Sequence, residues 1–184
     1  MKHMSILAVS LLALVACTPE KKQEADYSQY VNPMIGTDFT GNTYPGAQVP
    51  FGMVQLSPDN GLPGWDRISG YFYPDTTIAG FSHTHLSGTG AGDLYDISFM
   101  PVTRPYKEAP APLGIYSTFS HNDEAASAGY YRVLLKDYNI NVELTATERC
   151  GIQRYTFPEA EASVFLNLKK AMNWDFTLDS KIEV

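Results

Sequence analysis

The chain has 184 residues, a length that fits one domain with a sizeable buried core. Its net charge of −7 argues against a nucleic-acid partner, which would need clustered Lys and Arg, and against docking on an anionic membrane face. Neutral, hydroxyl-rich partners such as sugars are compatible with this charge.

The first 16 residues predict a lipoprotein signal peptide. A basic start precedes an apolar run over residues 6–16, which is too short to span a bilayer permanently. The run ends in Leu14-Val15-Ala16-Cys17, which resembles a bacterial lipobox. We therefore expect lipidation of Cys17 and export to a membrane of the periplasm or cell surface, with the outer membrane favoured. The alternative is an ordinary signal peptide with a chance Cys.

Residues 17–30 predict the lipidated Cys and a polar tether, because they carry both charge signs and no hydrophobic periodicity. From residue 31 onward, short apolar segments alternate with turns rich in Gly, Pro, Asn and Asp. In the first half we expect strands at Pro50–Leu56, Ile78–Ser82 and Ile97–Met100, a turn over 57–64 and a loop over 104–114.

The second half is more regular. Ile140, Val142, Leu144 and Ala146 alternate with polar residues, which predicts a strand with one buried face. Further strands are expected at Tyr130–Leu135, Gly151–Phe157 and Ser163–Leu168, a short helical segment at Asp123–Ala128, and a last strand at 176–184. The pattern predicts an all-β, antiparallel β-sandwich over residues 31–184. A strand at the end of the chain suggests that this domain is incomplete at its C-terminus.

The chain has 2 Cys. If lipidation consumes Cys17, Cys150 has no intramolecular disulfide partner, and we expect it to be a small buried hydrophobe.

Two segments, Gly64–Tyr73 and Gly80–Asp93, hold the residues best suited to bind a sugar. The face of Trp65 can pack against the apolar C–H side of a pyranose, and Asp66 can accept hydrogen bonds from sugar hydroxyls. Nearby glycines allow close approach of the backbone. Trp65 capping the core is the alternative interpretation.

His83 and His85 lie two residues apart, so on a strand they would share one face and could bind zinc. No third ligand stands at a suitable spacing, and we predict no metal site here. The carboxylates of Asp66, Asp93 and Asp96 could be tested as a catalytic pair, but nothing in the sequence assigns an acid and a base among them.

Long motifs run through most of the chain after residue 30. The main ones are Val31-Asn32-Pro33-Met34-Ile35-Gly36-Thr37, Tyr44-Pro45-Gly46-Ala47, Val49-Pro50-Phe51-Gly52-Met53-Val54-Gln55-Leu56-Ser57-Pro58-Asp59, Gly64-Trp65-Asp66 and Gly80-Phe81-Ser82-His83-Thr84-His85-Leu86-Ser87-Gly88-Thr89-Gly90. In these motifs the sequence resembles glycoside hydrolase family 92, whose members are exo-acting, calcium-dependent α-mannosidases.

The resemblance implies an N-terminal β-sandwich packed on an (α/α)6 barrel, with the substrate site between them and inversion at the anomeric carbon. It implies that the catalytic acid, the base and the calcium ligands belong to the helical domain, which this chain lacks. The chain alone is then inactive, and its partners are a mannose-containing glycan and the missing helical domain.

The resemblance assigns Trp65 and Asp66 to substrate contact. His83, His85, Gly88, Thr89 and Gly90 would shape the same site or the domain interface. Two other functions remain open from the sequence: a stand-alone carbohydrate-binding lipoprotein, and a scaffold lipoprotein in which these residues are idle.

Overall fold

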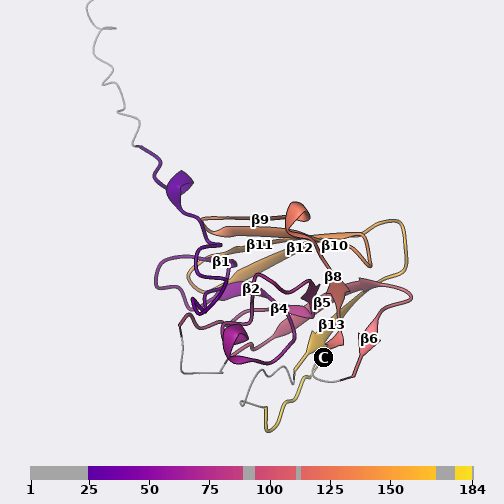
Figure 1. Cartoon of the computed structure of the whole chain (residues 1–184). Helices are drawn as coiled ribbons and strands as arrows, with labels where there is room; N and C mark the ends of the chain where they lie inside the picture. Colours follow the sequence, from indigo (N-terminus) through magenta and orange to yellow (C-terminus); the bar gives the residue numbers. More distant parts are fainter. Residues whose placement is uncertain (1–24, 89–93, 111–112, 169–176, 184) are drawn as a thin grey trace, which may run out of the picture.

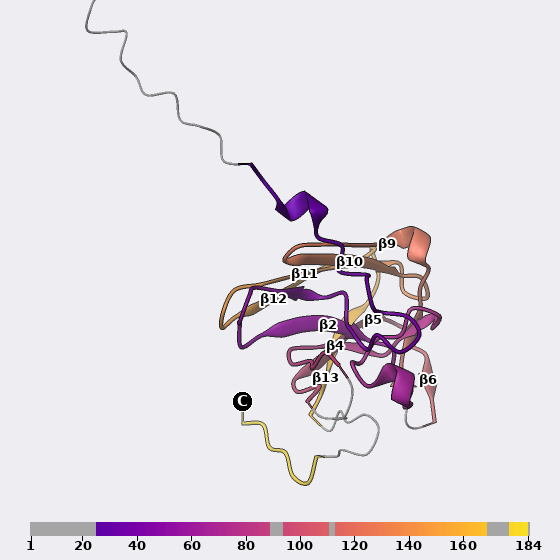
Figure 2. The same ribbon diagram turned by 60° about the vertical axis from the view of Figure 1, so that its left-hand side comes forward.

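The structure is a computed structural model that describes residues 25–88, 94–110, 113–168 and 177–183. Two antiparallel sheets lie face to face, with the four-stranded sheet above the five-stranded sheet in Figure 1. The view turned by 60° shows the same two layers, with the N-terminal segment leaving the domain beside the four-stranded sheet (Figure 2). The predicted all-β sandwich is confirmed.

The five-stranded sheet has the order β1-β2-β4-β5-β13, and the four-stranded sheet has the order β12-β11-β10-β9. The strands of the first are β1 (Ala47–Gln48), β2 (Gln55–Asp59), β4 (Gly80–Ser82), β5 (Ser98–Thr103) and β13 (Ala162–Asn167). Those of the second are β9 (Glu124–Ser127), β10 (Tyr130–Leu135), β11 (Ile140–Ala146) and β12 (Gly151–Thr156).

Smaller elements join these sheets. β3 (Thr77–Ile78) pairs with β8 (Ser117–Thr118), and β6 (Glu108–Ala109) pairs with β7 (Gly114–Ile115). The described residues also form the short 3-10 helices η1 (Ser28–Tyr30), η2 (Trp65–Arg67) and η3 (His121–Asp123). No helix within the described ranges is both long and apolar enough to cross a membrane.

The core lies between the two sheets. Ile140, Val142 and Leu144 of β11 point inward, whereas Asn141 and Thr145 point outward, as the alternating pattern predicts. Leu56, Phe81, Met100 and Val102 of the opposite sheet complete this core, with Tyr131, Val133 and Leu135 of β10. Burial of these side chains is the main driving force for the sandwich.

The regular second half matches its prediction closely, since β10 and β11 begin and end where the sequence places them. β12 ends one residue earlier than predicted, and β13 begins and ends one residue earlier. The first half differs more. Residues 50–54 form a turn and loop, and β2 begins only at Gln55 and continues through residues expected to form a turn. Pairing of Ser57, Pro58 and Asp59 with β4 overrides their local turn preference.

Two further predictions of secondary structure are wrong. Residues 124–127 form strand β9 instead of a helix, because a two-residue turn with Gly129 at φ 72° folds them back onto β10. Residues 177–183 contain no strand. Cys150 is exposed instead of buried, since it lies in the turn that joins β11 to β12. The predicted signal peptide and Cys17 lie outside the described residues.

A buried carboxylate links the four-stranded sheet to the segment that follows η2, next to the core. The side chain of Glu124 is 2% exposed and accepts hydrogen bonds from the hydroxyls of Tyr71 at 3.0 Å and Tyr131 at 2.6 Å. His121 lies 2.6 Å from the same carboxylate through Nδ1 and stacks on the ring of Tyr73. Burial and the charge of Glu124 raise the pKa of both tyrosines above its ordinary value.

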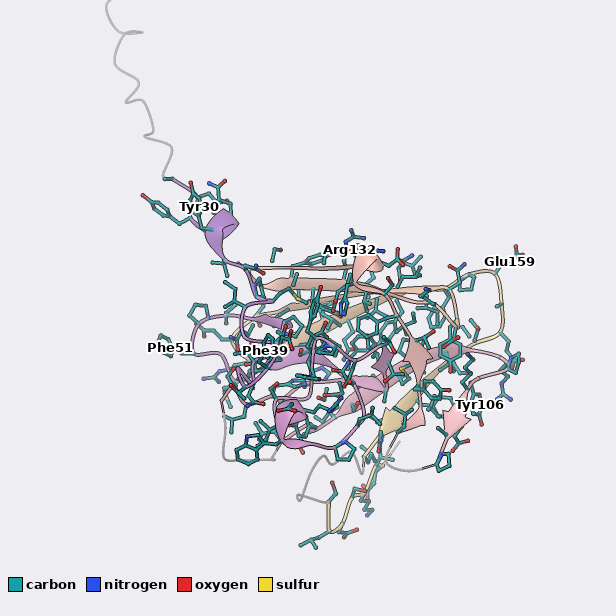
Figure 3. All side chains as sticks on the ribbon, viewed as in Figure 1. Tyr30, Phe39, Phe51, Tyr106, Arg132 and Glu159 are labelled. Atoms are coloured by element: carbon teal, nitrogen blue, oxygen red, sulfur yellow. The ribbon has the colours of Figure 1, made fainter. Side chains whose placement is uncertain are left out.

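Replacement of Glu124 by Ala is expected to lower the free energy of unfolding by about 2–4 kcal/mol, because it leaves two buried phenol hydroxyls without an acceptor. Urea denaturation followed by circular dichroism measures this loss. Glu159→Ala, at an exposed position on the loop labelled in Figure 3, is the matched control. Equal stability of the two variants would contradict this role for Glu124.

Candidate functional site

The short helix η2 carries the two residues that the sequence singles out most strongly. Gly64 precedes it at φ 150°, and a chain of backbone hydrogen bonds follows: Arg67 N to Gly64 O at 3.0 Å, and Gly70 N to Arg67 O at 2.9 Å. This tight turn leaves the Trp65 side chain about half exposed, at 53%. Trp65 is therefore not a core residue in this structure.

Asp66 follows Trp65 on the same turn and is partly exposed. Within the described residues, its carboxylate forms no hydrogen bond or ion pair. Its negative charge contributes to the raised pKa of the Arg67 guanidinium. A half-exposed aromatic ring next to such a carboxylate offers an apolar plate and a charged hydrogen-bond acceptor on one turn. Both kinds of contact can contribute to binding of a pyranose ring.

Arg67 anchors η2 to the rest of the domain. Its guanidinium forms a two-pronged ion pair with Asp75, in which Nε lies 2.6 Å from Oδ2. The same group lies 4.8 Å from the centre of the Phe72 ring. The hydrogen bonds to Asp75 raise the pKa of the Arg67 guanidinium above its ordinary value. The anchor limits the motion of the turn that carries Trp65.

The two histidines do not share a strand face, because β4 ends at Ser82. His83 donates from Nδ1 to the Ile97 carbonyl at 2.9 Å and packs against Phe99 and Gly151. His85 is instead buried and lies 2.9 Å from Asp59. In the described ranges, no group of three or more His, Cys, Asp or Glu residues could hold a metal ion.

The turn that follows the histidines is described only in part. Gly88 is exposed at φ 97°, and its N–H donates to the Asn42 carbonyl at 2.7 Å. Thr89, Gly90 and Asp93 lie outside the described residues. Asp96 accepts a hydrogen bond from the Thr84 hydroxyl at 3.1 Å, so the carboxylate is used within the loop.

The structure thus brings His85 close to the base of the Trp65 turn, and it places His83 on the side of β12. Sequence reasoning missed Asp59, Asn60 and Tyr95, which lie under that turn. Asp59-Asn60-Gly61 has the composition of an exposed turn, so the burial of the first two side chains could not be predicted from their residue types.

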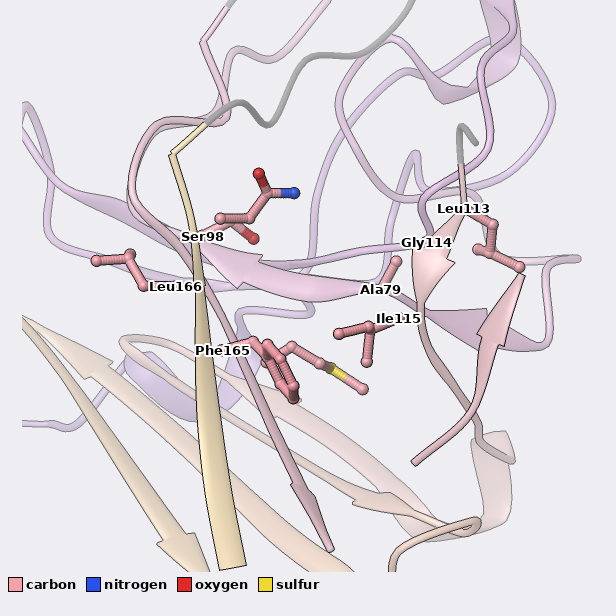
Figure 4. A pocket seen from close by; sticks show the side chains of 9 residues that line it. Ala79, Ser98, Leu113, Gly114, Ile115, Phe165 and Leu166 are labelled. Carbon is pink, nitrogen blue, oxygen red and sulfur yellow. The ribbon is translucent and has the colours of Figure 1, made fainter. Parts of the chain in front are cut away.

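Two of the cavities formed by the described residues lie away from this turn. A groove of about 570 Å³ is lined by Val31, Ile35, Tyr44, Pro50 and Phe51, among others, and its lining contains no acidic or basic residue. A smaller cavity of about 160 Å³ lies between β5, β13 and the β6–β7 hairpin, lined by Ser98, Ile115 and Phe165 among others (Figure 4). Trp65 and Asp66 line neither of them.

Residues 30–184 match the sequence model of the glycosyl hydrolase family 92 N-terminal domain. The chain belongs to this family. The resemblance proposed from the motifs is therefore confirmed.

Solved structures of family 92 enzymes share this fold. The α-mannosidase BT3965 of Bacteroides thetaiotaomicron, solved in complex with mannoimidazole, is 45% identical with a TM-score of 0.72. The match covers 77% of this chain and 20% of that enzyme. The inverting mannosidase BT2199 of the same organism is 31% identical with a TM-score of 0.63, over 78% of this chain and 20% of that one.

A curated relative from Arthroderma benhamiae, described as an uncharacterized secreted glycosidase, is 26% identical over 172 residues. That alignment covers 88% of this chain and 21% of the relative. The chain therefore spans about a fifth of the length of the family 92 proteins that it matches.

Arg67→Lys is expected to lower the free energy of unfolding by about 1–2 kcal/mol, because Lys keeps the charge but cannot form the two-pronged pair. Arg154→Lys is the matched control, since Arg154 forms the same kind of pair with Glu143 on the outer face of the sheet. The side chains of the first pair are 23% and 8% exposed, against 71% and 22% for the second. Urea denaturation should show the larger loss at Arg67, and the reverse order would contradict the anchoring role.

Proposed function

We propose that this chain forms one wall of the mannoside site of an α-mannosidase that removes terminal mannose from glycans with inversion. Membership of family 92 supports this proposal, together with two relatives whose titles name them as mannosidases, one inverting and one bound to mannoimidazole. The observation that carries it is the half-exposed Trp65 ring beside the Asp66 carboxylate.

In this proposal, Trp65 packs against the C–H face of mannose and Asp66 accepts hydrogen bonds from its hydroxyls. Hydrolysis with inversion further requires a protonated acid and an ionised base roughly 6.5–9.5 Å apart. We assign neither to this chain and place both in the helical part of the enzyme. The contribution of this wall is to bind and orient the sugar.

Calcium does not fit the described residues, because they contain no cluster of three or more metal-ligating side chains of the His, Cys, Asp or Glu type. The proposed role of this wall therefore involves no metal ion held by the described residues. In the proposal, any calcium ion is bound by the helical part of the enzyme.

The groove lined by Val31, Ile35, Pro50 and Phe51 is the surface that we propose to contact the helical part. The Phe51 ring is fully exposed, at 106%, although its backbone stands at φ 60°, which is unfavourable for Phe. Phe39 is a second exposed phenylalanine in the left-handed region, and both are labelled in Figure 3. An apolar groove without acidic or basic side chains suits a protein interface better than solvent.

We also propose that the protein is exported and held at a membrane through a lipid on Cys17. The support is the lipobox-like sequence that ends at Cys17, and the description of the Arthroderma benhamiae relative as secreted. Mass spectrometry of the protein from its membrane fraction tests this proposal.

The proposal can be tested with a hybrid enzyme in which this chain replaces the corresponding region of BT3965. We expect the isolated chain, with calcium, to leave α-mannobiose intact and the hybrid enzyme to hydrolyse it. Trp65→Ala should lower kcat/KM of the hybrid about 30-fold, the equivalent of roughly 2 kcal/mol of lost contact. Tyr27→Ala, an exposed aromatic residue outside this site, is the control. Turnover by the isolated chain, or equal activity of the two variants, would contradict the proposal.

Phe51→Gly tests the proposed interface. Glycine relieves the unfavourable φ, so the variant should unfold at the same or higher urea concentration than the unmodified chain. Its affinity for the separately produced remainder of BT3965 should fall at least about tenfold, as expected for a central aromatic contact. Leu178→Gly, an exposed apolar residue outside the groove, should leave the affinity unchanged. Calorimetric titration measures the affinities of both variants. An unchanged affinity of Phe51→Gly would reject this interface.

A further inference from the structure

A buried Asp–His pair lies beneath the turn that carries Trp65. The side chains of Asp59, at the end of β2, and His85 are both 0% exposed. Nε2 of His85 is 2.9 Å from Oδ1 of Asp59, and Nδ1 is 2.7 Å from the Gln55 carbonyl. Because a carbonyl can only accept, Nδ1 donates there. The hydrogen bond at Nε2 then requires a second proton, held between Nε2 and Oδ1 of Asp59, and with it both ends of the imidazole are fixed.

Two serine hydroxyls also contact the Asp59 carboxylate. Ser82 donates to Oδ1 at 3.0 Å, and Ser98 donates to Oδ2 at 3.5 Å. A buried carboxylate needs such partners, because an unsatisfied charge in the interior is costly. The carboxylate therefore joins the ends of β2, β4 and β5 at one point.

Gly70 rests directly on this pair. A Cβ atom added at Gly70 would lie 3.0 Å from both Oδ1 of Asp59 and Cδ2 of His85, and 2.9 Å from the Tyr95 ring. Gly70 also stands at φ 90°, which disfavours other residues. Its carbonyl accepts from Asn60 N at 2.8 Å, so the backbone after Asp59 holds it as well.

Backbone hydrogen bonds connect Gly70 to Trp65. Gly70 N donates to Arg67 O at 2.9 Å, and Ile68 N donates to Trp65 O at 3.4 Å. The hydroxyl of Tyr95 donates to the carbonyl of Ile68 from below. A displacement of Gly70 is therefore transmitted through this turn to Trp65 and Asp66.

We propose that Asp59 and His85 are positioning residues, which set the orientation of the turn that presents Trp65 and Asp66. The link to mannose rests on the proposed function, whereas the placement of the turn does not. Without the His85 imidazole, the turn would keep its own backbone hydrogen bonds. It would be free to adopt more than one orientation relative to the sheet.

The Asp59–His85–Ser82 group is not a nucleophilic triad. In a triad, the carboxylate and the serine occupy opposite nitrogens of the histidine. Here both lie on Nε2, with Ser82 Oγ at 3.2 Å, and the hydroxyl is directed to Asp59. Ser82 is also fully buried, so no substrate reaches it. Positioning is the role that this geometry supports.

Fluorine resonance of 5-fluorotryptophan tests the proposal in the full chain. The sequence contains two tryptophans, so Trp174→Phe leaves Trp65 as the sole probe. We expect one narrow Trp65 resonance in this parent, and a shifted resonance at least about twice as broad in His85→Leu, as exchange between orientations produces. His85→Gln, which can still donate to Asp59, should restore most of the narrow signal. His83→Leu is the matched control.

Because His85→Leu leaves a buried carboxylate poorly paired, it can prevent folding, and Ser82→Ala provides the milder variant. It removes one hydrogen bond to Asp59 and should shift the Trp65 resonance in the same direction, by less. A parent-like resonance in whichever of these two variants folds, or no rescue by Gln, would overturn the proposal. Titration of the parent with methyl α-mannoside tests the sugar contact separately, because an unchanged Trp65 resonance there would count against the proposed function only.

Discussion

A buried carboxylate must find its hydrogen bonds within the protein, and this constraint organises the side of the domain that carries η2. The carboxylate of Asp59 is reached by Ser82 and His85, which lie on one segment, and by Ser98, which lies on the next strand. The glycine at position 70 is required because the turn passes directly over this group. The short helix η2 therefore owes its position to a polar cluster below it as well as to the apolar core.

Glu124 has the corresponding role on the other sheet. It accepts hydrogen bonds from the hydroxyls of Tyr71 and Tyr131. It also contacts His121, whose ring stacks on Tyr73. Arg67 and Asp75 complete this arrangement at the end of η2. The segment from Trp65 to Asp75 is thus held at three points, which suits a surface that must present the same side chains to every ligand.

Strands that follow from local hydrophobic periodicity could be predicted from the sequence. Strands that depend on pairing with distant residues could not. The alternation from Ile140 to Ala146 and the β-formers from Tyr130 to Leu135 gave strands with correct bounds, because one buried face imposes a period of two. The second half of β2 was missed because its partner, β4, is distant in the sequence. β9 was missed for a local reason, because the sequence interpretation did not recognise the two-residue turn that joins it to β10. Family membership could be predicted from long motifs in the correct order, since such motifs carry more information than periodicity.

The candidate site was predictable only in part. Trp65 and Asp66 were found from their residue types and the family motif, and the structure places them on an exposed turn. Their contact with a sugar remains a prediction. Asp59 was missed because an Asp-Asn-Gly sequence is typical of an exposed turn, and its burial depends on His85, which is 26 residues away. Cys150 was misjudged for the related reason that its burial depends on the turn after β11.

The central claim is that Trp65 and Asp66 form the mannose-binding part of this wall. A crystal structure of this chain joined to the remainder of BT3965, with mannoimidazole bound, tests it most directly. We expect the Trp65 ring to lie in van der Waals contact with the sugar and the Asp66 carboxylate to accept a hydrogen bond from one of its hydroxyls. A bound sugar that touches neither residue would show that this turn does not bind mannose.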